Sequence, residues 1–273
     1  MRANTVAAML RTNVLGSFKR TMYTLETINF KSCKLPVTVT SDNILQQEQL
    51  DNFRPFQQWL QKLDKNLGDY ELQKIHIQSV DIFSNNRIGF LKLKTQVVHP
   101  PTKKTIPGIV LLRGPTVAML VILEPPNCAS DAQRYAILVS QPRVPAGDMN
   151  LLEMPAGMID DGTFTGSAAK EIQEECGITI NEDELKDLTP NWIPQDSGIL
   201  LSPGLVDESC RFYSCTKQMP LSEIQDLDGK LQMGTEHENI SLKLVPLDKI
   251  NQTKVQDAKF FLALGFYRSL ISK

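Results

Sequence analysis

The sequence predicts an α/β protein in which a mixed α/β body follows an antiparallel β subdomain. Two continuous apolar runs, residues 117–123 and 135–139, are typical of strands that are covered on both faces and lie inside a sheet. Residues 71–83 and 87–98 alternate apolar and polar side chains, which indicates strands with one solvated face. Residues 165–176 have the spacing of an amphipathic helix with one apolar face.

The first 25 residues differ in composition from the rest of the chain. They contain no Asp or Glu, while four basic residues are spread among Ser, Thr, Ala and Leu, which is typical of an organellar transit peptide. A disordered extension of a cytosolic protein is the alternative, and a secretory signal is disfavoured because no long apolar run occurs. We expect residues 1–45 to be an N-terminal extension and the protein to be cytoplasmic, plastid or mitochondrial.

The next elements predict a helix and a hairpin. Apolar residues recur at the spacing of one helix face from Phe56 to Leu63, Pro55 suits a first helical position and Gly68 ends the helix. Ser84 to Asn86 join the two alternating segments, which favours a β-hairpin. Residues 46–108 are therefore expected to form a helix followed by antiparallel strands.

A mostly apolar stretch over residues 106–123 leads into the second part of the chain. It is about long enough to cross a bilayer, because a spanning helix needs about 20 residues. It also contains Arg113, Pro107 and Pro115, which a lipid-exposed helix would not carry together. We interpret it as two buried strands and expect no membrane partner.

Charge and cysteine content exclude several classes of protein. The chain has 273 residues, with 29 Lys and Arg against 31 Asp and Glu, for a formal net charge of -2. A nucleic-acid partner is not expected, because affinity for a phosphate backbone needs a clear excess of basic residues. The five cysteines are scattered without a C-x-x-C pair and the three histidines lie far apart, so neither a disulfide framework nor a zinc site is indicated.

The predicted helix over residues 165–176 carries three acids on one side. Glu171, Glu174 and Glu175 share one arc of the helix, Thr165 is a candidate N-cap and Gly177 is the expected stop. The opposite, apolar arc holds Ala169, Ile172 and Cys176.

Such an acidic arc favours a divalent cation. Like charges at these spacings repel by about a few tenths of a kcal/mol per exposed pair. Hard carboxylate oxygens suit Mg²⁺ or Mn²⁺, whose usual partner is a substrate phosphate. A solvated acidic face is the alternative. The Pro-Ala-Gly turn and the Asp160-Asp161-Gly162 segment just upstream favour the metal site.

This segment resembles the Nudix hydrolase family, whose motif is G-x5-E-x7-R-E-U-x-E-E-x-G-U with U aliphatic. The matching residues are Gly157, Glu171, Glu174, Glu175, Gly177 and Ile178. The spacing from Gly157 to Glu171 is one residue shorter than in the motif, the first Glu is replaced near Thr163, and Lys170 replaces Arg. In this family the Glu-x-x-x-Glu pair ligates metal and the first Glu supports the loop, so the differences affect the loop more than the ligands.

Further segments are similar to the ADP-sugar pyrophosphatases, and in particular to the plant plastid type. They are Gln141-Pro-Arg143, Leu152-Glu153-Met-Pro-Ala-Gly157, Ser202-Pro-Gly204 with Glu208, Glu236-His-Glu238, residues 87–92, 107–110 and 113–118. The resemblance covers roughly residues 53–267 and implies a Nudix fold over residues 109–273, with a mixed β-sheet sandwiched between α-helices. It also implies cleavage of ADP-glucose or ADP-ribose to AMP and a sugar phosphate by a homodimer whose residues 46–108 contribute to the interface.

The resemblance implies roles for individual residues. The Ala156 carbonyl, Glu171 and Glu175 are expected to bind Mg²⁺ or Mn²⁺, with Glu174 as a further ligand or support. Glu236 corresponds to the catalytic base and a metal ligand, with Glu238 and Glu208 as alternatives or supports; three surface acids are the competing interpretation. Arg143 presents a planar fork suited to phosphate oxygens, although a surface salt bridge fits it as well. Glu153 and Gly157 complete the expected substrate-binding set.

Two functions from different classes stay open. In the first, the protein is a metal-dependent hydrolase of nucleotide sugars, of which ADP-glucose, ADP-ribose and UDP-glucose are candidates. In the second, the domain binds a nucleotide sugar without catalysis, as a sensor. The acids of the helix favour the enzyme, because a binding module does not need carboxylates that activate water.

Overall fold

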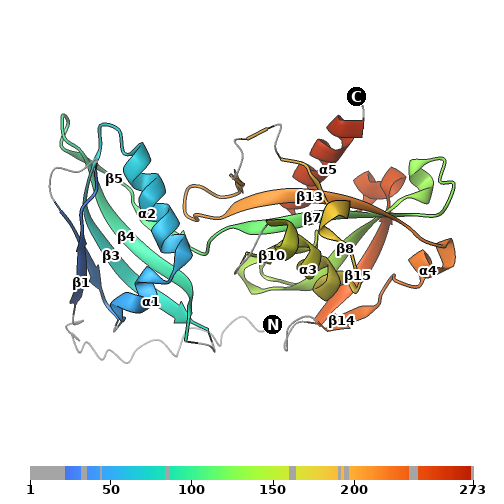
Figure 1. The fold of residues 1–273 in the computed structure, drawn as a ribbon, viewed down its shortest axis with the longest axis horizontal. Helices are drawn as coiled ribbons and strands as arrows, with labels where there is room; N and C mark the ends of the chain where they lie inside the picture. Colours follow the sequence, from blue (N-terminus) through green and yellow to red (C-terminus); the bar gives the residue numbers. More distant parts are fainter. Residues whose placement is uncertain are drawn as a thin grey trace, which may run out of the picture. The chain divides into compact units, whose positions relative to one another are not determined.

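The computed structural model describes residues 22–31, 36–43, 45–83, 86–159, 164–189, 192–193, 197–233 and 239–271 (Figure 1). It divides into two compact units, the first built from residues 1–50 and 64–108 and the second from residues 51–63 and 109–273. Each unit has its own sheet, and each is described separately below.

The first unit is built on a sheet with strand order β1-β2-β3-β4-β5. The strands are β1 Tyr23–Ile28, β2 Val37–Ser41, β3 Glu71–Ile82, β4 Ile88–His99 and β5 Lys104–Ile106. Two helices occur in this part of the sequence, α1 Gln47–Asp51 and α2 Arg54–Asn66. The predicted hairpin is confirmed by the antiparallel pair β3/β4, and the helix predicted from Pro55 is confirmed by α2.

The first sheet differs from the sequence-based expectation in two respects. Part of the expected N-terminal extension forms β1 and β2, and β2 pairs with β3 in parallel although only antiparallel strands were expected. Val37 and Val39 of β2 are fully buried, so this short strand belongs to the core of the unit. A parallel partner is brought in by a long connection, which no local pattern in the sequence specifies.

The second unit is built on a mixed sheet with the central order β11-β13-β7-β8-β15-β14. Its strands are β7 Thr116–Glu124, β8 Tyr135–Arg143, β11 Lys186–Asp187, β13 Ser209–Gln218, β14 Leu231–Met233 and β15 Asn239–Pro246, joined at their sides by β9 Asp148–Glu153, β10 Ala156–Met158 and β12 Ile199–Leu200; β6 Ile109–Leu112 opens this part of the chain. β13 runs parallel to β7, whereas β8 is antiparallel to both β7 and β15. The predicted mixed sheet is therefore confirmed.

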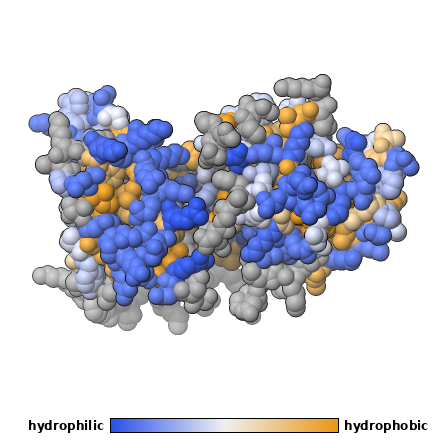
Figure 2. All heavy atoms as spheres, in the orientation of Figure 1, coloured by the Kyte–Doolittle hydropathy of each residue, from blue (hydrophilic) through white to orange (hydrophobic). Residues whose placement is uncertain are grey.

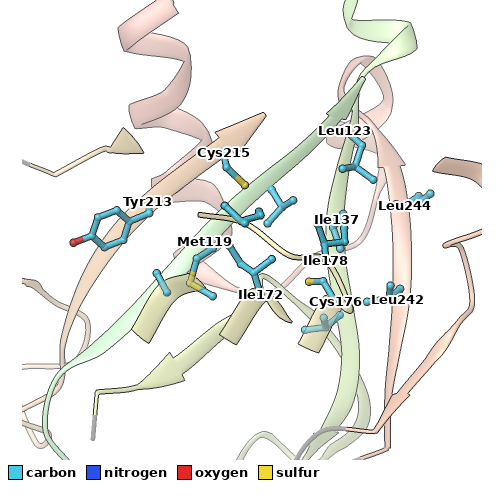
Figure 3. Close-up of a cluster of buried hydrophobic side chains, with 14 of the residues drawn as sticks. Met119, Leu123, Ile137, Ile172, Cys176, Ile178, Tyr213, Cys215, Leu242 and Leu244 are labelled. Carbon is cyan, nitrogen blue, oxygen red and sulfur yellow. The ribbon is translucent and has the colours of Figure 1, made fainter. Parts of the chain in front are cut away.

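Helices cover both faces of this sheet. They are α3 Phe164–Cys176, α4 Leu221–Gln225 and α5 Ala258–Ile271, with short 3-10 helices η1 Asp131–Gln133, η2 Val144–Ala146, η3 Glu182–Glu184 and η4 Leu247–Gln252. Alternate residues of β7 enter two separate cores: Met119 packs with Ile172 of α3, and Leu120 packs with Phe260 of α5. Figure 3 shows the core on the α3 side. Full burial of β7 on both faces explains its continuous apolar sequence.

The site segment runs through a gap between β7 and β8. Within the described pairing these two strands meet only around Ile122 and Leu123. Beyond that point β9 pairs with β8 and β10 pairs with β7, so residues 153–156 cross from one strand to the other. The chain after β10 leads to α3, and the acids of α3 are thereby brought beside this crossing.

The start of α3 corrects the sequence-based expectation. Thr165 does not cap α3, because the helix already begins at Phe164, and its hydroxyl instead donates to Glu182.

The apolar residues of α5 are not all buried. Phe260 and Leu264 lie in the core, but Phe261 is 52% exposed. Phe261 has a ring contact with Phe260, so the apolar stretch is wider than the buried face of the helix.

A pocket in the described surface lies within the first unit. Its volume is about 690 Å³, and its lining is Tyr23, Asp42, Asn43, Leu45, Gln46, Gln49, Val80, Ile82 and Asn86. None of these residues is a predicted site residue. Figure 2 shows mainly hydrophilic residues on the visible face of each unit, with smaller hydrophobic areas among the hydrophilic ones. In the described part of the chain, no helix is both long and apolar enough to span a bilayer.

Candidate active site

The backbone of residues 153–157 is held by contacts from separate elements. The N–H of Met154 donates to Oδ2 of Asp257 at 3.0 Å, and Asp257 is the residue immediately before α5. The carbonyl of Pro155 accepts the N–H of Met119 on β7 at 2.9 Å. Both anchors come from buried residues, so the turn between β9 and β10 is fixed from two sides of the sheet.

Glu175 of α3 holds the next residue of the turn. Its Oε2 accepts the N–H of Ala156 at 3.1 Å, and its Oε1 lies 3.5 Å from Nε2 of Gln141 on β8. The residue is 6% exposed. Burial, followed by the nearby charge of Glu171, raises the pKa of Glu175 to about 8, against the opposing hydrogen bond from Ala156. A predicted metal-binding acid therefore lies against the predicted metal-binding residue Ala156.

Glu171 lies directly over Gly157. A Cβ atom built on Gly157 would come 1.7 Å from Oε1 of Glu171, which is far inside any permitted contact. The backbone of Gly157 has no left-handed torsion angle in this structure, so the requirement for glycine here is one of space. The structure thus brings together Gly157 and Glu171, which this sequence separates by one position fewer than the motif does.

Glu174, the third acid of the helix, contacts a partner on the exposed surface of α3 itself. Its Oε1 pairs with Nζ of Lys170 at 3.5 Å, one helical turn earlier. Both side chains are substantially exposed, so this pair adds little stability. The pair has the i,i+4 spacing at which side chains meet on one face of a helix.

The donor chemistry of α3 fits a divalent cation. Glu171, Glu174 and Glu175 supply the hard oxygen ligands that Mg²⁺ and Mn²⁺ prefer. The negative charges of Glu171 and Glu175 repel each other, and a cation between them would favour the ionised form of both. Within the described ranges, however, no three His, Cys, Asp or Glu side chains converge closely enough to hold a metal ion as they stand.

Arg143 and Glu153 form the shortest ion pair among the described residues of the site. Nε of Arg143 donates to Oε1 of Glu153 at 2.6 Å, and the carboxylate of Glu153 is 4% exposed while the Arg143 side chain is 38% exposed. The second carboxylate oxygen lies 3.5 Å from Nζ of Lys259 on α5. The sequence-predicted substrate residues Arg143 and Glu153 are therefore in direct contact, and Lys259 joins them.

Lys259 also contacts Asp257, which completes a network of four charges in which both carboxylates are buried. Oδ1 of Asp257 accepts both the N–H and Nζ of Lys259, at 3.0 and 2.9 Å. The first of these bonds is an N-terminal helix cap, because α5 begins at Ala258. Burial lowers the pKa of Lys259, but the negative charges of Asp257 and then of Glu153 raise it by more. The pKa of Lys259 therefore lies above its ordinary value.

Glu208 lies in a separate polar cluster. It accepts the hydroxyl of Thr116 at 3.0 Å and pairs with Arg113 at 3.3 Å. The adjacent Asp207 accepts the backbone N–H of Arg113 at 2.7 Å and of Gly114 at 3.2 Å, and burial raises the pKa of Asp207 despite these bonds. Thr116 pairs across the sheet with Met158 of β10, the residue directly after Gly157, so this cluster lies at the end of β10 beside Gly157.

The remaining predicted site residues lie outside the described part of the chain. They are Glu236 and Glu238, together with Thr163 and the Asp160-Asp161-Gly162 segment. Trp192 is 56% exposed, and its ring centroid lies 5.4 Å from that of Phe266.

Two residues of the site network, Asp257 and Lys259, were missed from the sequence. The signal available was weak: an Asp directly before the apolar stretch of α5 is a helix-cap pattern, and a Lys at the second helical position is common in many helices. Asp257 and Met154 are 103 positions apart, so no spacing rule connects them.

Comparison with known proteins gives one relative by sequence. No family model matches the chain. A curated relative, the chloroplastic Nudix hydrolase 14 of Arabidopsis thaliana, is 38% identical over 221 residues, which cover 78% of this chain and 69% of the relative. A solved structure of an ADP compounds hydrolase is 18% identical and superposes with a TM-score of 0.49, covering 74% of this chain and 96% of that one. Identity at this level over more than two thirds of the sequence establishes that the chain belongs to the Nudix hydrolase family.

Proposed function

We propose that this chain is a metal-dependent hydrolase that cleaves the pyrophosphate bond of ADP-glucose or ADP-ribose to AMP and a sugar phosphate. The observation that supports it most is the convergence of Glu171, Glu175 and the Arg143–Glu153 pair on one firmly anchored turn, residues 153–157. Acids and a guanidinium around one rigid turn are the groups that a pyrophosphate and its cation require.

The cation would be Mg²⁺ or Mn²⁺, held by Glu171, Glu174, Glu175, the Ala156 carbonyl and Glu236. When bound, it neutralises the pyrophosphate and lowers the pKa of a coordinated water. Glu236 takes the proton of the attacking water, with Glu238 or Glu208 as the alternative acceptor. Arg143 holds a phosphate oxygen through its guanidinium, and Glu153 and Gly157 set the shape of the adjoining surface.

A substrate panel tests this proposal. Purified protein is incubated with ADP-glucose, ADP-ribose and UDP-glucose, with Mg²⁺, with Mn²⁺ and with chelator, and products are identified by mass. AMP released from the ADP-sugars only when metal is present supports the proposal. Release of UMP from UDP-glucose alone would identify a UDP-sugar hydrolase, and nucleotide-sugar binding without any product would identify a sensor.

A variant of Glu175 tests whether this acid is needed for hydrolysis. Glu175→Gln keeps the shape of the side chain and its contact with Ala156, but removes the charge. We expect kcat/KM at saturating metal to fall by at least about 100-fold. Glu223→Gln, on the exposed surface of α4, is the matched control and should stay within about twofold of the parent. Equal activity in the two variants contradicts the role given to Glu175.

The assembly and the destination of the protein are part of the same proposal. We infer a homodimer to which residues 46–108 contribute, and light scattering coupled to gel filtration measures its mass directly. The composition of residues 1–25 and the chloroplastic relative support delivery to an organelle. A fluorescent protein fused behind residues 1–45 should then enter plastids or mitochondria, whereas diffuse cytoplasmic fluorescence contradicts the inference.

A further inference from the structure

We propose that Asp257 and Lys259 are positioning residues for substrate binding: Asp257 holds the ammonium of Lys259 beside Glu153, and Lys259 shares with Arg143 the neutralisation of Glu153, so that Arg143 keeps its terminal guanidinium nitrogens for a phosphate of the substrate. The inference rests on the proposed function of Arg143. It assigns a role to the beginning of α5, an element outside the family motif.

The first step is that the two carboxylate oxygens of Glu153 face different cations. One oxygen accepts Nε of Arg143 at 2.6 Å and the other faces Nζ of Lys259 at 3.5 Å. Among the described residues, Nε is the only nitrogen of the Arg143 guanidinium with a hydrogen bond, and this side chain is 38% exposed. The bond at Nε fixes the plane of the guanidinium, while its terminal nitrogens are available to a ligand.

The second step is the charge balance of the network. Glu153 and Asp257 are both buried, at 3% and 6% exposed, and two buried carboxylates need two cations. Arg143 and Lys259 supply them. Without the ammonium of Lys259, Arg143 would be the only cation beside the two oxygens of Glu153. An arginine and a carboxylate paired alone favour two parallel hydrogen bonds, one to each oxygen. This two-bond fork uses a terminal nitrogen that the substrate needs.

The third step is the anchoring of Lys259 itself. Asp257 accepts two bonds from Lys259 through Oδ1 and the N–H of Met154 through Oδ2. The same carboxylate therefore fixes the ammonium that faces Glu153 and the backbone residue next to Glu153. α5 is thereby coupled to both the side chain and the backbone of the substrate-binding turn.

The test is a double-mutant cycle on KM and kcat with the best substrate of the panel. Lys259→Met should raise KM about tenfold and change kcat by less than about threefold, since binding is affected and the acids of α3 are untouched. In an Arg143→Met background, Lys259→Met should change KM by less than about twofold, because its effect passes through Arg143. Lys259→Arg should restore KM to within about threefold of the parent.

Lys254→Met is the matched control, because Lys254 is exposed and lies five positions before Lys259. It should leave KM and kcat unchanged, and melting temperatures are recorded for every variant. Should Lys259→Met fail to fold, Lys259→Gln removes the charge while keeping a polar group of similar length. An unchanged KM in the folded variant, or an equal rise of KM with and without Arg143, overturns the inference; the latter would mean that Lys259 contacts the substrate directly.

A second measurement does not depend on turnover. In arginine side-chain NMR spectra, with Arg143→Met for assignment, the terminal groups of Arg143 should rotate freely in the parent and slow down in Lys259→Met as the fork forms. If the parent hydrolyses nothing, the proposed function fails while this spectrum still decides the positioning role. Identical Arg143 signals in the parent and in Lys259→Met contradict the role of Lys259.

Discussion

At the scale of single residues, Gly157 and Glu171 set the tightest limit in the candidate active site. A methyl carbon at position 157 would lie 1.7 Å from the Glu171 carboxylate, so there is room only for hydrogen. The obstacle is the end of a flexible side chain, so a larger residue can be accommodated by moving Glu171. Residue 157 should therefore affect the position of a proposed metal ligand much more than it affects folding.

Gly157→Ala is expected to reduce kcat/KM by at least about 100-fold, because Glu171 leaves its position, while the free energy of unfolding falls by less than about 2 kcal/mol. The measurements are steady-state hydrolysis and thermal unfolding. Gly204→Ala is the matched control, because a methyl group at Gly204 meets no atom within 4 Å, and both its activity and stability should match the parent. A Gly157→Ala enzyme as active as Gly204→Ala would show that Glu171 is not needed where it lies.

At the scale of elements, α3 ends at Gly177, which has a backbone conformation that only glycine adopts easily. Gly177 has a φ of 68° and its N–H bonds to the carbonyl of Gln173 at 3.1 Å, which ends the helix in the left-handed region. α5 contains the contrasting case, since Gly265 lies within the helix, is exposed and has open space around it.

The same substitution should therefore have opposite effects on these two helices. Gly177→Ala is expected to lower the free energy of unfolding by about 1 kcal/mol, because alanine is strained at positive φ. Gly265→Ala is expected to raise it by about 0.5–1 kcal/mol, because glycine is a poor residue inside a helix. Urea unfolding of both variants measures the difference, and a shift of the same sign in both would contradict this account of the helix ends.

The elements also show what the sequence could predict. α3, β7, β8 and the β3/β4 hairpin were predicted because each is specified by the periodicity of its own residues. The acids of α3 were found for the same reason. The joining of Lys259 to Glu153, and of Asp257 to Met154, was not predicted, because tertiary packing brings these residues together from separate elements. The wrong cap at Thr165 reflects the usual uncertainty of a helix boundary by one or two residues.

At the scale of the whole molecule, the cysteines report on the two cores of the second unit. Cys176 and Cys215 belong to the core on the α3 side and Cys210 to the core on the α5 side. Burial raises the pKa of Cys210 and of Cys215 to about 12, and that of Cys176 well above its usual value. Cys128 is only partly buried.

Alkylation at pH 8 should therefore separate the cysteines. Because the thiolate is the reactive form, Cys128 is expected to react with iodoacetamide in native buffer, whereas Cys176, Cys210 and Cys215 should react only when denaturant unfolds the second unit. Mass spectrometry of tryptic peptides over a denaturant series measures each site. Loss of the three buried thiols in one transition would indicate that the two cores unfold together, and labelling of Cys210 in native buffer would contradict its burial.

The hydrogen bond between Met154 and Asp257 joins residues 103 positions apart, and this separation has a consequence during synthesis. A ribosome adds about 5–20 residues per second, so about 5–20 s pass between the two residues. For most of that interval, once α3 has been made, the nascent chain carries the acids of α3 without the residue that fixes their neighbouring turn. Any hydrolysis by this protein should therefore begin only after α5 has left the ribosome.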